Sequence, residues 1–350
     1  GGVNYFSPQH DTFVHYDYGR KINSYYSYIG EIVIDKNEHL WLSTDGGGIT
    51  CVDKKWNTLQ QFTAGGKNSI SHNNVKSICY DEKKNCLYIG TYLGGLSRYD
   101  LNTGRFYNYW KEESHSSDMP DEIVYHVKIW KDQIYISAHN GFFRLDTQTQ
   151  KFHRINIPFA FYEHFDIDAE GNLYMVGWKN VLCTHVEHPE SIVYVPLARV
   201  LATSDGVYIG TLGMGLFFYD RQTRNMAHYT SRNNQLPGDF CYNLCRTQDG
   251  KILITGDKGV TCFVPSEGTF TTIDLMRNFP STHIINGCGI LVSGEGSIYI
   301  GDTKGVTVFS ENEFNKTGTA NENSNFYFSE LWVDNKTIIP GDDTGILSQS

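Results

Sequence analysis

The sequence predicts an all-β fold, a seven-bladed β-propeller built from four-stranded antiparallel blades. Two observations predict it. One strand-turn-strand unit recurs along nearly the whole chain, and seven copies of an apolar second-strand segment follow one another at intervals of 34–47 residues. Propeller blades repeat at about 40–50 residues, whereas a parallel β-helix has a much shorter period. No segment longer than about ten residues shows the periodicity of a helix.

The clearest copy of the unit is Val75–Trp110. Its hydrophobic pattern predicts four strands, at 75–80, 86–90, 96–99 and 105–110. The segments between them are rich in Asp, Asn and Gly, which favour hairpins and turns. The second half of the unit aligns without gaps at four further places, which begin at Gly2, Gly48, Gly141 and Gly215. Five ungapped copies indicate a true repeat.

The second strands predict the number of blades and the way the ring closes. They end at Thr44, Thr91, Ala138, Gly177, Thr211, Gly256 and Asp302. The last blade, from Asn286, has no clear outer strand, whereas Thr12–Asp17 reads as an outer strand without a blade of its own. We expect Thr12–Asp17 to pair with residues 286–310, because this pairing removes an exposed edge and restrains both ends.

The organisation along the chain follows from where the repeat stops. We expect a propeller over residues 1–311, a linker over 312–325 and the start of a further domain over 326–350. The linker is polar and rich in Asn, Gly and Thr, as loops are, and Phe326–Val333 is expected to be a strand. Because the chain begins inside a repeat copy, we expect it to be a piece of a longer protein.

Composition excludes some partners and sites. The net charge is −10, so nucleic acid is not an expected partner, since its phosphates would be repelled. The eight cysteines include no Cys-x-x-Cys pair, so no metal site and no cofactor is expected. Most lie in apolar strand patterns and are expected to be buried free thiols. Cys79 and Cys86 are the one pair considered for a disulfide across a hairpin. No stretch has the roughly 18 apolar residues of a membrane helix.

A set of positions in the copy 74–109 defines a recognisable repeat. The positions are Asn74, Val75, Ile78, Asp81, Leu87–Thr91, Gly95, Leu96, Arg98–Asp100, Thr103, Gly104, Phe106 and Tyr109. This pattern resembles the two-component regulator propeller repeat. The run Glu330–Leu347 is similar to the beginning of the Ig-like domain that follows such propellers. The resemblance therefore implies that residues 326–350 begin a truncated Ig-like β-sandwich domain.

Such repeats are typical of the extracytoplasmic sensors of hybrid two-component systems in glycan-degrading bacteria. The resemblance implies the second propeller of a periplasmic sensor, which relays a signal to a downstream histidine kinase. The partners it implies are an oligosaccharide and the neighbouring propeller and Ig-like domain of the same chain. A homodimer is considered as well, and the membrane would be reached only through segments that follow this chain. The resemblance implies no catalysis in this part and assigns no ligand residues.

The sequence lacks the motifs that would indicate an enzyme. The sequence has no sialidase-type Asp box, no HExxH, no Walker loop and no GxSxG, and no catalytic residue is expected. Asp166, Asp168 and Glu170 alternate along a strand into a turn. A calcium loop would need a closing bidentate Glu, so these residues are predicted to form a solvated hairpin.

Candidate ligand residues follow from position in the ring. The leading loops, which precede the inner strands, and the turns between second and third strands are expected on one face, where ligands usually dock. Aromatic rings beside imidazole donors suit a sugar, which has C–H faces and hydroxyls. The ligand-binding candidates are Tyr92, His139 and Trp178 on the turns, with His164 and Tyr242 at the leading loops.

Two other functions remain open at this point. A scaffold propeller would use the same face for dimerisation or docking and would show a flat apolar patch. An enzyme acting on polysaccharide would show two carboxylates close together.

Overall fold

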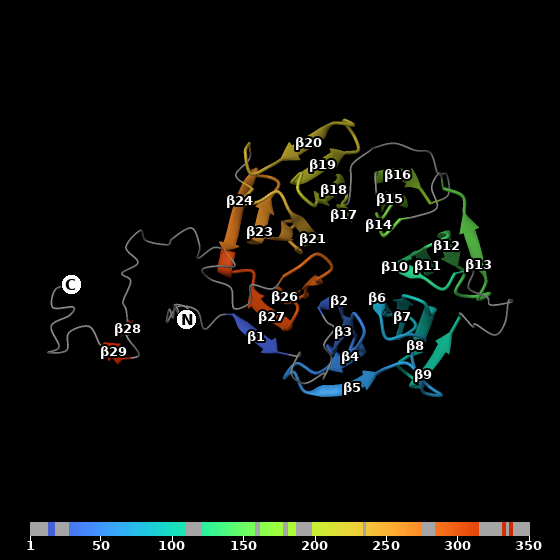
Figure 1. Ribbon diagram of the computed structural model, residues 1–350. Helices are drawn as coiled ribbons and strands as arrows, with labels where there is room; N and C mark the ends of the chain where they lie inside the picture. Colours follow the sequence, from blue (N-terminus) through green and yellow to red (C-terminus); the bar gives the residue numbers. More distant parts are fainter. Residues whose placement is uncertain are drawn as a thin grey trace.

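The computed structural model describes residues 13–17, 28–109, 121–157, 162–177, 181–186, 198–233, 236–274, 284–314, 331–333 and 336–338. Within these residues, seven antiparallel sheets surround a common centre (Figure 1). In blades 1, 2, 3, 5 and 6 the first strand in the sequence lies nearest the centre and the fourth lies at the outer edge (Figure 1). The prediction of an all-β, seven-bladed propeller is confirmed.

The first four blades take up residues 29–185. Blade 1 consists of β2 (Ile29–Ile34), β3 (Leu40–Thr44), β4 (Gly48–Val52) and β5 (Thr58–Phe62). Blade 2 consists of β6 (Val75–Asp81), β7 (Cys86–Thr91), β8 (Gly95–Asp100) and β9 (Arg105–Asn108). Blade 3 consists of β10 (Val124–Trp130), β11 (Gln133–Ala138), β12 (Gly141–Leu145) and β13 (Phe152–Ile155). In blade 4 the structure describes three strands, β14 (His164–Ile167), β15 (Asn172–Val176) and β16 (Val181–His185).

The remaining three blades complete the ring. Blade 5 consists of β17 (Ala198–Ala202), β18 (Gly206–Thr211), β19 (Leu216–Asp220) and β20 (Met226–Tyr229). Blade 6 consists of β21 (Cys241–Arg246), β22 (Ile252–Gly256), β23 (Gly259–Val264) and β24 (Thr269–Asp274). Blade 7 consists of β25 (Ile290–Val292), β26 (Ser297–Gly301), β27 (Gly305–Ser310) and β1 (Val14–Asp17). Its sheet confirms that the N-terminal strand closes the ring.

The closing strand is held by backbone pairing and by an aromatic stack. Strand β1 runs antiparallel to β27, with Val14 opposite Val308 and Asp17 opposite Gly305. The ring of Tyr16 stacks on Trp56, which follows β4 of blade 1, with centroids 4.0 Å apart. The N-terminal strand thus joins blade 7 to blade 1 as well as completing blade 7.

The glycine near the end of the second strand lies where the inner strand of the next blade packs closely. A Cβ on Gly90 would lie 2.5 Å from Cγ1 of Val124, and a Cβ on Gly210 would lie 2.9 Å from Cβ of Cys241. Val124 and Cys241 are the first residues of the inner strands of the following blades. A larger side chain in place of either glycine would push two blades apart.

The Thr of the repeat fixes the turn between second and third strands. The buried hydroxyl of Thr91 donates to the carbonyl of Gly95 at 2.9 Å. Thr44 and Thr211 make the same bond to Gly48 and Gly215. Because these bonds fasten both ends of the turn, the residues between them stand at fixed positions on the surface.

The cysteines of the described side chains are free, and the considered disulfide does not form. Cys79 lies opposite Tyr88 in the hairpin, whereas Cys86 lies opposite Asp81. The two thiols are therefore diagonal neighbours, about 7–8 Å apart, which is beyond the reach of a disulfide. Burial raises the pKa of Cys79 to about 12.

The part after the propeller is described only in short pieces. Phe314 packs against Phe309, with ring centroids 6.1 Å apart, so the packed core extends past the boundary predicted at residue 311. Farther on, β28 (Leu331–Val333) pairs with β29 (Lys336–Ile338), and β28 falls inside the predicted strand 326–333. The other residues of 315–350 lie outside the described part, and the Ig-like domain stays a prediction. No helix among the described residues has the length and apolarity to cross a bilayer.

Candidate functional site

The leading loops and the second-to-third turns lie on one face of the ring, which we call the loop face. Within blade 2, the N–H of Tyr92 donates to the carbonyl of Asn74 at 2.9 Å. Between blades 5 and 6, the N–H of Gly213 donates to the carbonyl of Asp239, also at 2.9 Å. These backbone bonds join each turn to the loop of its own or of the next blade, so both sets of side chains share this face.

Three aromatic side chains gather on the loop face between blades 2 and 3. The hydroxyl of Tyr125 lies 3.3 Å from Nδ1 of His139. Burial raises the pKa of Tyr125 to about 12, and the nearby Tyr92 adds to the rise. The ring of Tyr92 is 36% exposed and has the ammonium of Lys76 5.7 Å from its centroid. Tyr125 therefore contacts one predicted residue, His139, and lies near another, Tyr92; we call these three residues the aromatic group.

His164, another predicted residue, lies at the centre of the ring beside His126. The two imidazole centroids are 4.2 Å apart. The adjacent Phe165 is fully buried within the blade packing, so alternation along β14 turns His164 the other way, toward the centre. Nδ1 of His164 is buried and has no hydrogen-bond partner in the described part of the chain.

The surroundings of His164 keep it neutral at neutral pH. Burial lowers the pKa of His164 well below its usual value, because the charged form would lose its hydration. The positive charges of His126, Arg199 and Lys128 lower the pKa further.

A recurring β-bulge sets which side chains face the centre. Pairing registers shift between Ile29 and Ile32 in β2, Val75 and Ser77 in β6, Val124 and His126 in β10, and Cys241 and Asn243 in β21. In β10, Val124 and Val127 both pack into the core although they are three residues apart. The bulge therefore turns His126, which lies between them, out of the core.

Glu31 of β2 links blade 1 to blades 2 and 3. Its Oε2 accepts the N–H of Ile78 at 2.6 Å and the hydroxyl of Ser77 at 2.8 Å, and its Oε1 lies 2.9 Å from Nδ1 of His126. Burial alone would raise the pKa of Glu31, but His126 and these hydrogen bonds outweigh it, and the pKa is lowered. A charged carboxylate is therefore stable at the centre.

Ser77, His126 and Glu31 contain the residue types of a catalytic triad but not its geometry. In a triad, the acid and the nucleophile bind different nitrogens of the imidazole. Here the hydroxyl of Ser77, at 3.4 Å, and the carboxylate of Glu31 both approach Nδ1 of His126. The hydroxyl also donates to Glu31. These contacts hold blades together and do not activate a nucleophile.

Other central side chains repeat this linking role. The hydroxyl of Ser77 accepts the N–H of Val127 in blade 3 at 3.0 Å. In blade 4, Asp166 forms an ion pair with Lys128 and accepts the N–H of Ala202 in blade 5 at 2.7 Å. Together with Glu31, side chains of three inner strands thus bond to the backbone of the following inner strand.

Arg199 of β17 is a central residue that the sequence analysis does not single out. The adjacent Val200 is buried in the core, so alternation turns Arg199 toward the centre. The side chain of Arg199 forms no hydrogen bond or ion pair in the described part of the chain. Burial raises the pKa of Tyr28, and the positive charge of Arg199 opposes this rise. The guanidinium of Arg199 therefore lies near the phenol of Tyr28 as well as near His164.

The other two predicted residues are not brought into this site. Tyr242 lies within the bulge of β21 in blade 6, partly buried against the core of blade 7, and the aromatic group lies between blades 2 and 3. Trp178 lies outside the described residues. The structure therefore places Tyr92 and His139 on the loop face of the neighbouring blades 2 and 3, His164 at the centre and Tyr242 apart.

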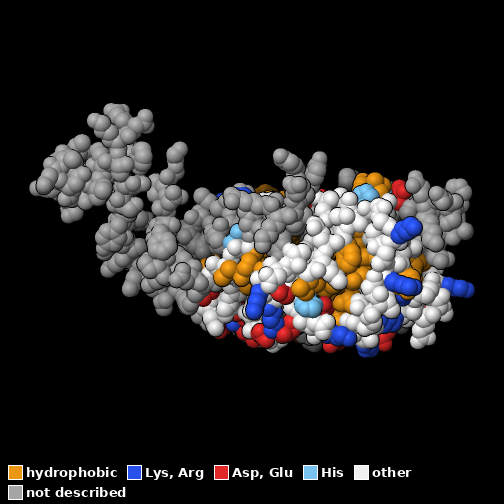
Figure 2. Space-filling view, turned by 90° about the horizontal axis from the view of Figure 1, so that it is seen from below, with side chains coloured by type: hydrophobic (Ala, Val, Ile, Leu, Met, Phe, Trp, Pro, Cys, Tyr) orange, Lys and Arg blue, Asp and Glu red, His pale blue; other side chains and the backbone are white. Residues whose placement is uncertain are grey.

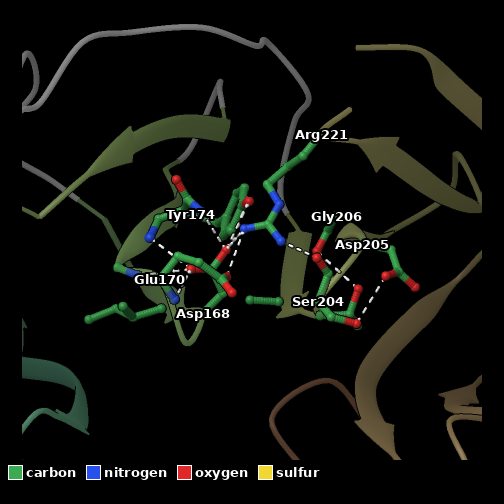
Figure 3. Close-up of polar contacts among 12 residues, drawn as sticks. Asp168, Glu170, Tyr174, Ser204, Asp205, Gly206 and Arg221 are labelled. Atoms are coloured by element: carbon green, nitrogen blue, oxygen red, sulfur yellow. Dashed lines mark hydrogen bonds and ion pairs between the residues drawn. The ribbon is translucent and has the colours of Figure 1, made fainter. Parts of the chain in front are cut away.

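On the opposite face, Arg221 ties hairpins of blades 4 and 5 together (Figure 3). Its guanidinium pairs with Asp168 and, at 3.1 Å, with Glu170, and it donates to the carbonyl of Ser204. The prediction of a solvated hairpin is wrong for Asp166 and Asp168, which are both buried because they bond to the neighbouring blade. No group of three or more His, Cys, Asp or Glu suited to a metal ion occurs among the described residues.

Charged side chains and exposed hydrophobic side chains both occur on the surface. On the edge seen in Figure 2, acidic and basic side chains lie side by side, mostly along the lower rim. Mixed charges of this kind offer no basic stripe to a phosphate backbone. Exposed hydrophobic side chains occur on the loop face as well: Tyr92, Leu93, Met214, Phe240 and Ile285.

The fold is similar to those of several solved structures. The extracellular domain of the putative hybrid two component system BT3049 from B. thetaiotaomicron matches with a TM-score of 0.73 and 19% identity, over 95% of this chain and 46% of that chain. The corresponding domain of BT4673 from the same organism matches with a TM-score of 0.66 and 17% identity, over 85% of this chain and 39% of that chain.

A third similar structure is a streptogramin B lyase, with a TM-score of 0.63, 11% identity and coverage of 85% of this chain and 96% of that chain. This chain spans less than half the length of the two extracellular domains. No protein-family model and no curated protein matches the sequence. At these identities the likeness shows a shared fold.

Proposed function

We propose that this chain is an extracytoplasmic sensor propeller that takes part in recognising an oligosaccharide and relays the bound state to a histidine kinase of the same protein. The aromatic group on the loop face is the observation that carries the proposal. Extracellular domains of two putative hybrid two-component systems share the fold, which supports the sensing role and a periplasmic location.

The aromatic group suits a sugar for chemical reasons. The exposed ring of Tyr92 offers a flat surface to the C–H face of a pyranose, and the hydroxyl of Tyr125 and the imidazole of His139 offer hydrogen bonds to its rim. The turns that carry Tyr92 and His139 are tied to the leading loops through backbone bonds, so little ordering entropy opposes binding. Binding rather than catalysis is proposed because Ser77, His126 and Glu31 serve to link blades.

The proposal is tested with calorimetric titration of an oligosaccharide panel into this chain and into the longer ectodomain. For the oligosaccharide that binds best, Tyr92→Ala and Tyr125→Ala are each expected to weaken affinity about tenfold or more, equal to about 1.4 kcal/mol. Tyr107→Ala is the matched control, because Tyr107 is an exposed tyrosine on the outer strand β9, packed on Arg98. Equal affinities of all three variants and the wild type would contradict the proposal.

A second candidate function is docking of a protein on the loop face. The exposed side chains Met214, Phe240 and Ile285 favour it, since apolar side chains that gather on one face mark interaction surfaces. Phe240→Ser with Met214→Ser should then change the association state of the longer ectodomain measured with light scattering. If this double variant leaves association unchanged while Tyr92→Ala loses the sugar, the sensing function stands alone.

A further inference from the structure

The centre of the ring holds a positive charge that its own carboxylates do not neutralise. Glu31 is engaged by Ser77, Ile78 and His126. Asp166 is engaged by Lys128 and by the N–H groups of Ile167 and Ala202. Glu31 and Asp166 therefore have their partners, and the side chain of Arg199 has no ion pair or hydrogen bond within the described residues.

The inner strand of the preceding blade carries a second polar group without a partner, His164. Nδ1 of His164 is buried and makes no hydrogen bond among the described residues. The inner strands of blades 4 and 5 are held in register by the bond from the N–H of Ala202 to Asp166. His164 precedes Asp166 by two residues and Arg199 precedes Ala202 by three, so both lie nearer the loop face than this bond.

Tyr28, in the leading loop just before β2 of blade 1, adds a third hydrogen-bond donor. Its ring covers Gly287, whose Cβ, if present, would lie 3.0 Å from the ring. Burial and Asp45 raise the pKa of Tyr28, so its hydroxyl keeps its proton. The phenol forms no hydrogen bond within the described residues. A guanidinium, an imidazole and a phenol thus lie unpaired on the loop-face side of the centre.

Unpaired polar groups of this kind are costly unless a ligand or water satisfies them. We propose that Arg199, with His164 and Tyr28, binds an anionic oxygen group of the ligand, a carboxylate or a sulfate substituent of a sugar. Arginine suits such groups because its planar fork makes two parallel hydrogen bonds to a pair of oxygens. The inference rests on the proposed function and narrows it, since the oligosaccharide recognised is then an acidic one.

The first test measures affinity with galactose-based sugars that carry different charged groups or none. Oligogalacturonides carry carboxylates, sulfated galacto-oligosaccharides carry sulfates, and neutral galacto-oligosaccharides carry neither. Titration calorimetry should show that one of the two charged ligands binds more tightly than the neutral one and that added salt weakens it. Arg199→Gln should weaken that ligand at least tenfold, about 1.4 kcal/mol, and Arg199→Lys should lie between. Arg105→Gln, at an exposed arginine of β9, is the control expected to bind like the wild type.

The second test needs no sugar. Melting temperatures of the wild type and of Arg199→Gln are compared in sodium sulfate and in sodium chloride of equal ionic strength. Sulfate stabilises folded proteins in general. The readout is therefore the rise in melting temperature from chloride to sulfate, which should be larger for the wild type and Arg105→Gln than for Arg199→Gln. His164→Asn provides a second variant. Sulfate, compared with chloride, should stabilise this variant less than it stabilises the wild type.

The outcomes separate the two proposals. If neutral and charged sugars bind equally well and Arg199→Gln keeps both affinities, the anion site is wrong and the sensing function stands. If no sugar binds but sulfate stabilises only proteins that retain Arg199, the sensing function is wrong and the anion site stands. If sulfate stabilises Arg199→Gln as much as the wild type, Arg199 is merely hydrated at the centre and the anion site is overturned.

Discussion

The imidazoles of His126 and His164 lie 4.2 Å apart at the centre of the ring, but they have different electrostatic roles. His126 has the carboxylate of Glu31 2.9 Å from its Nδ1. His164 is buried, has no such partner and lies near positive groups, so its pKa is held well below the usual value. Only one histidine of the pair therefore has a carboxylate partner, and His164 is kept neutral.

The first prediction concerns pH. The pKa of an unfolded histidine is about 6.5, so below this pH the unfolded chain binds a proton at His164 that the folded chain does not. Stability is therefore expected to fall as pH decreases below about 6.5, by up to about 1.4 kcal/mol per pH unit from this residue. Urea unfolding at pH 7.5, 6.5 and 5.5 should show a smaller loss for His164→Asn than for the wild type. Identical losses in the two proteins would rule out this role of His164.

The second prediction concerns Glu31. Its lowered pKa means that its stabilising effect is present above the usual carboxyl pKa and is lost as pH falls through the lowered value. At neutral pH, Glu31→Ala leaves the N–H of Ile78 and His126 without their acceptor and should cost about 2–3 kcal/mol. Glu38→Ala removes an exposed surface ion pair with Lys54 and should have little effect on stability. Similar unfolding free energies for both variants would show that Glu31 does not link the blades.

The third prediction concerns the closing strand. Tyr16 and Trp56 stack across the junction of blades 7 and 1, and such aromatic pairs contribute about 0.5–1.5 kcal/mol beyond the area they bury. Tyr16→Ala, Trp56→Ala and the double variant form a thermodynamic cycle whose coupling should lie in this range. A coupling near zero in denaturant unfolding would mean that closure depends on the β1–β27 pairing alone.

The fourth prediction concerns Arg221. Its guanidinium is the cation paired with the buried Asp168. Arg221→Ala leaves that carboxylate with its hydrogen bonds but without a counter-charge, and should cost about 1.5–3 kcal/mol. Arg224→Ala, at an exposed arginine of the same turn, should have little effect. The prediction is wrong if thermal unfolding of the two variants is indistinguishable.

The blades were predictable from the sequence because their determinants are local and repeated. The Gly and Thr of the repeat act at each copy in the same way, through the approach of Val124 to Gly90 and the bond from Thr91 to Gly95. Ring closure was predictable for a related reason, since an outer strand at one end and a missing one at the other are both visible in the pattern.

The central site was only partly predictable. The bulge between Val124 and His126 breaks the alternation that assigns side chains to faces, so the orientation of His126 cannot be obtained from spacing. Arg199 and Glu31 stand within inner strands, and their role depends on which strands of other blades lie beside them. The position of Tyr92 in blade 2 near Tyr125 in blade 3 is likewise a property of two neighbouring blades.

Closure by β1 also determines which blade is completed last during folding. His15 and Thr307 are hydrogen-bonded at 3.1 Å although 292 residues separate them along the chain. Contacts of such high contact order form slowly, because the chain entropy is lost before the pairing compensates for it. During synthesis β1 has no partner until β27 has left the ribosome, so blade 7 is the last to be completed. Until that moment an unpaired strand edge is open to other chains, and this interval is when misassembly is most favoured.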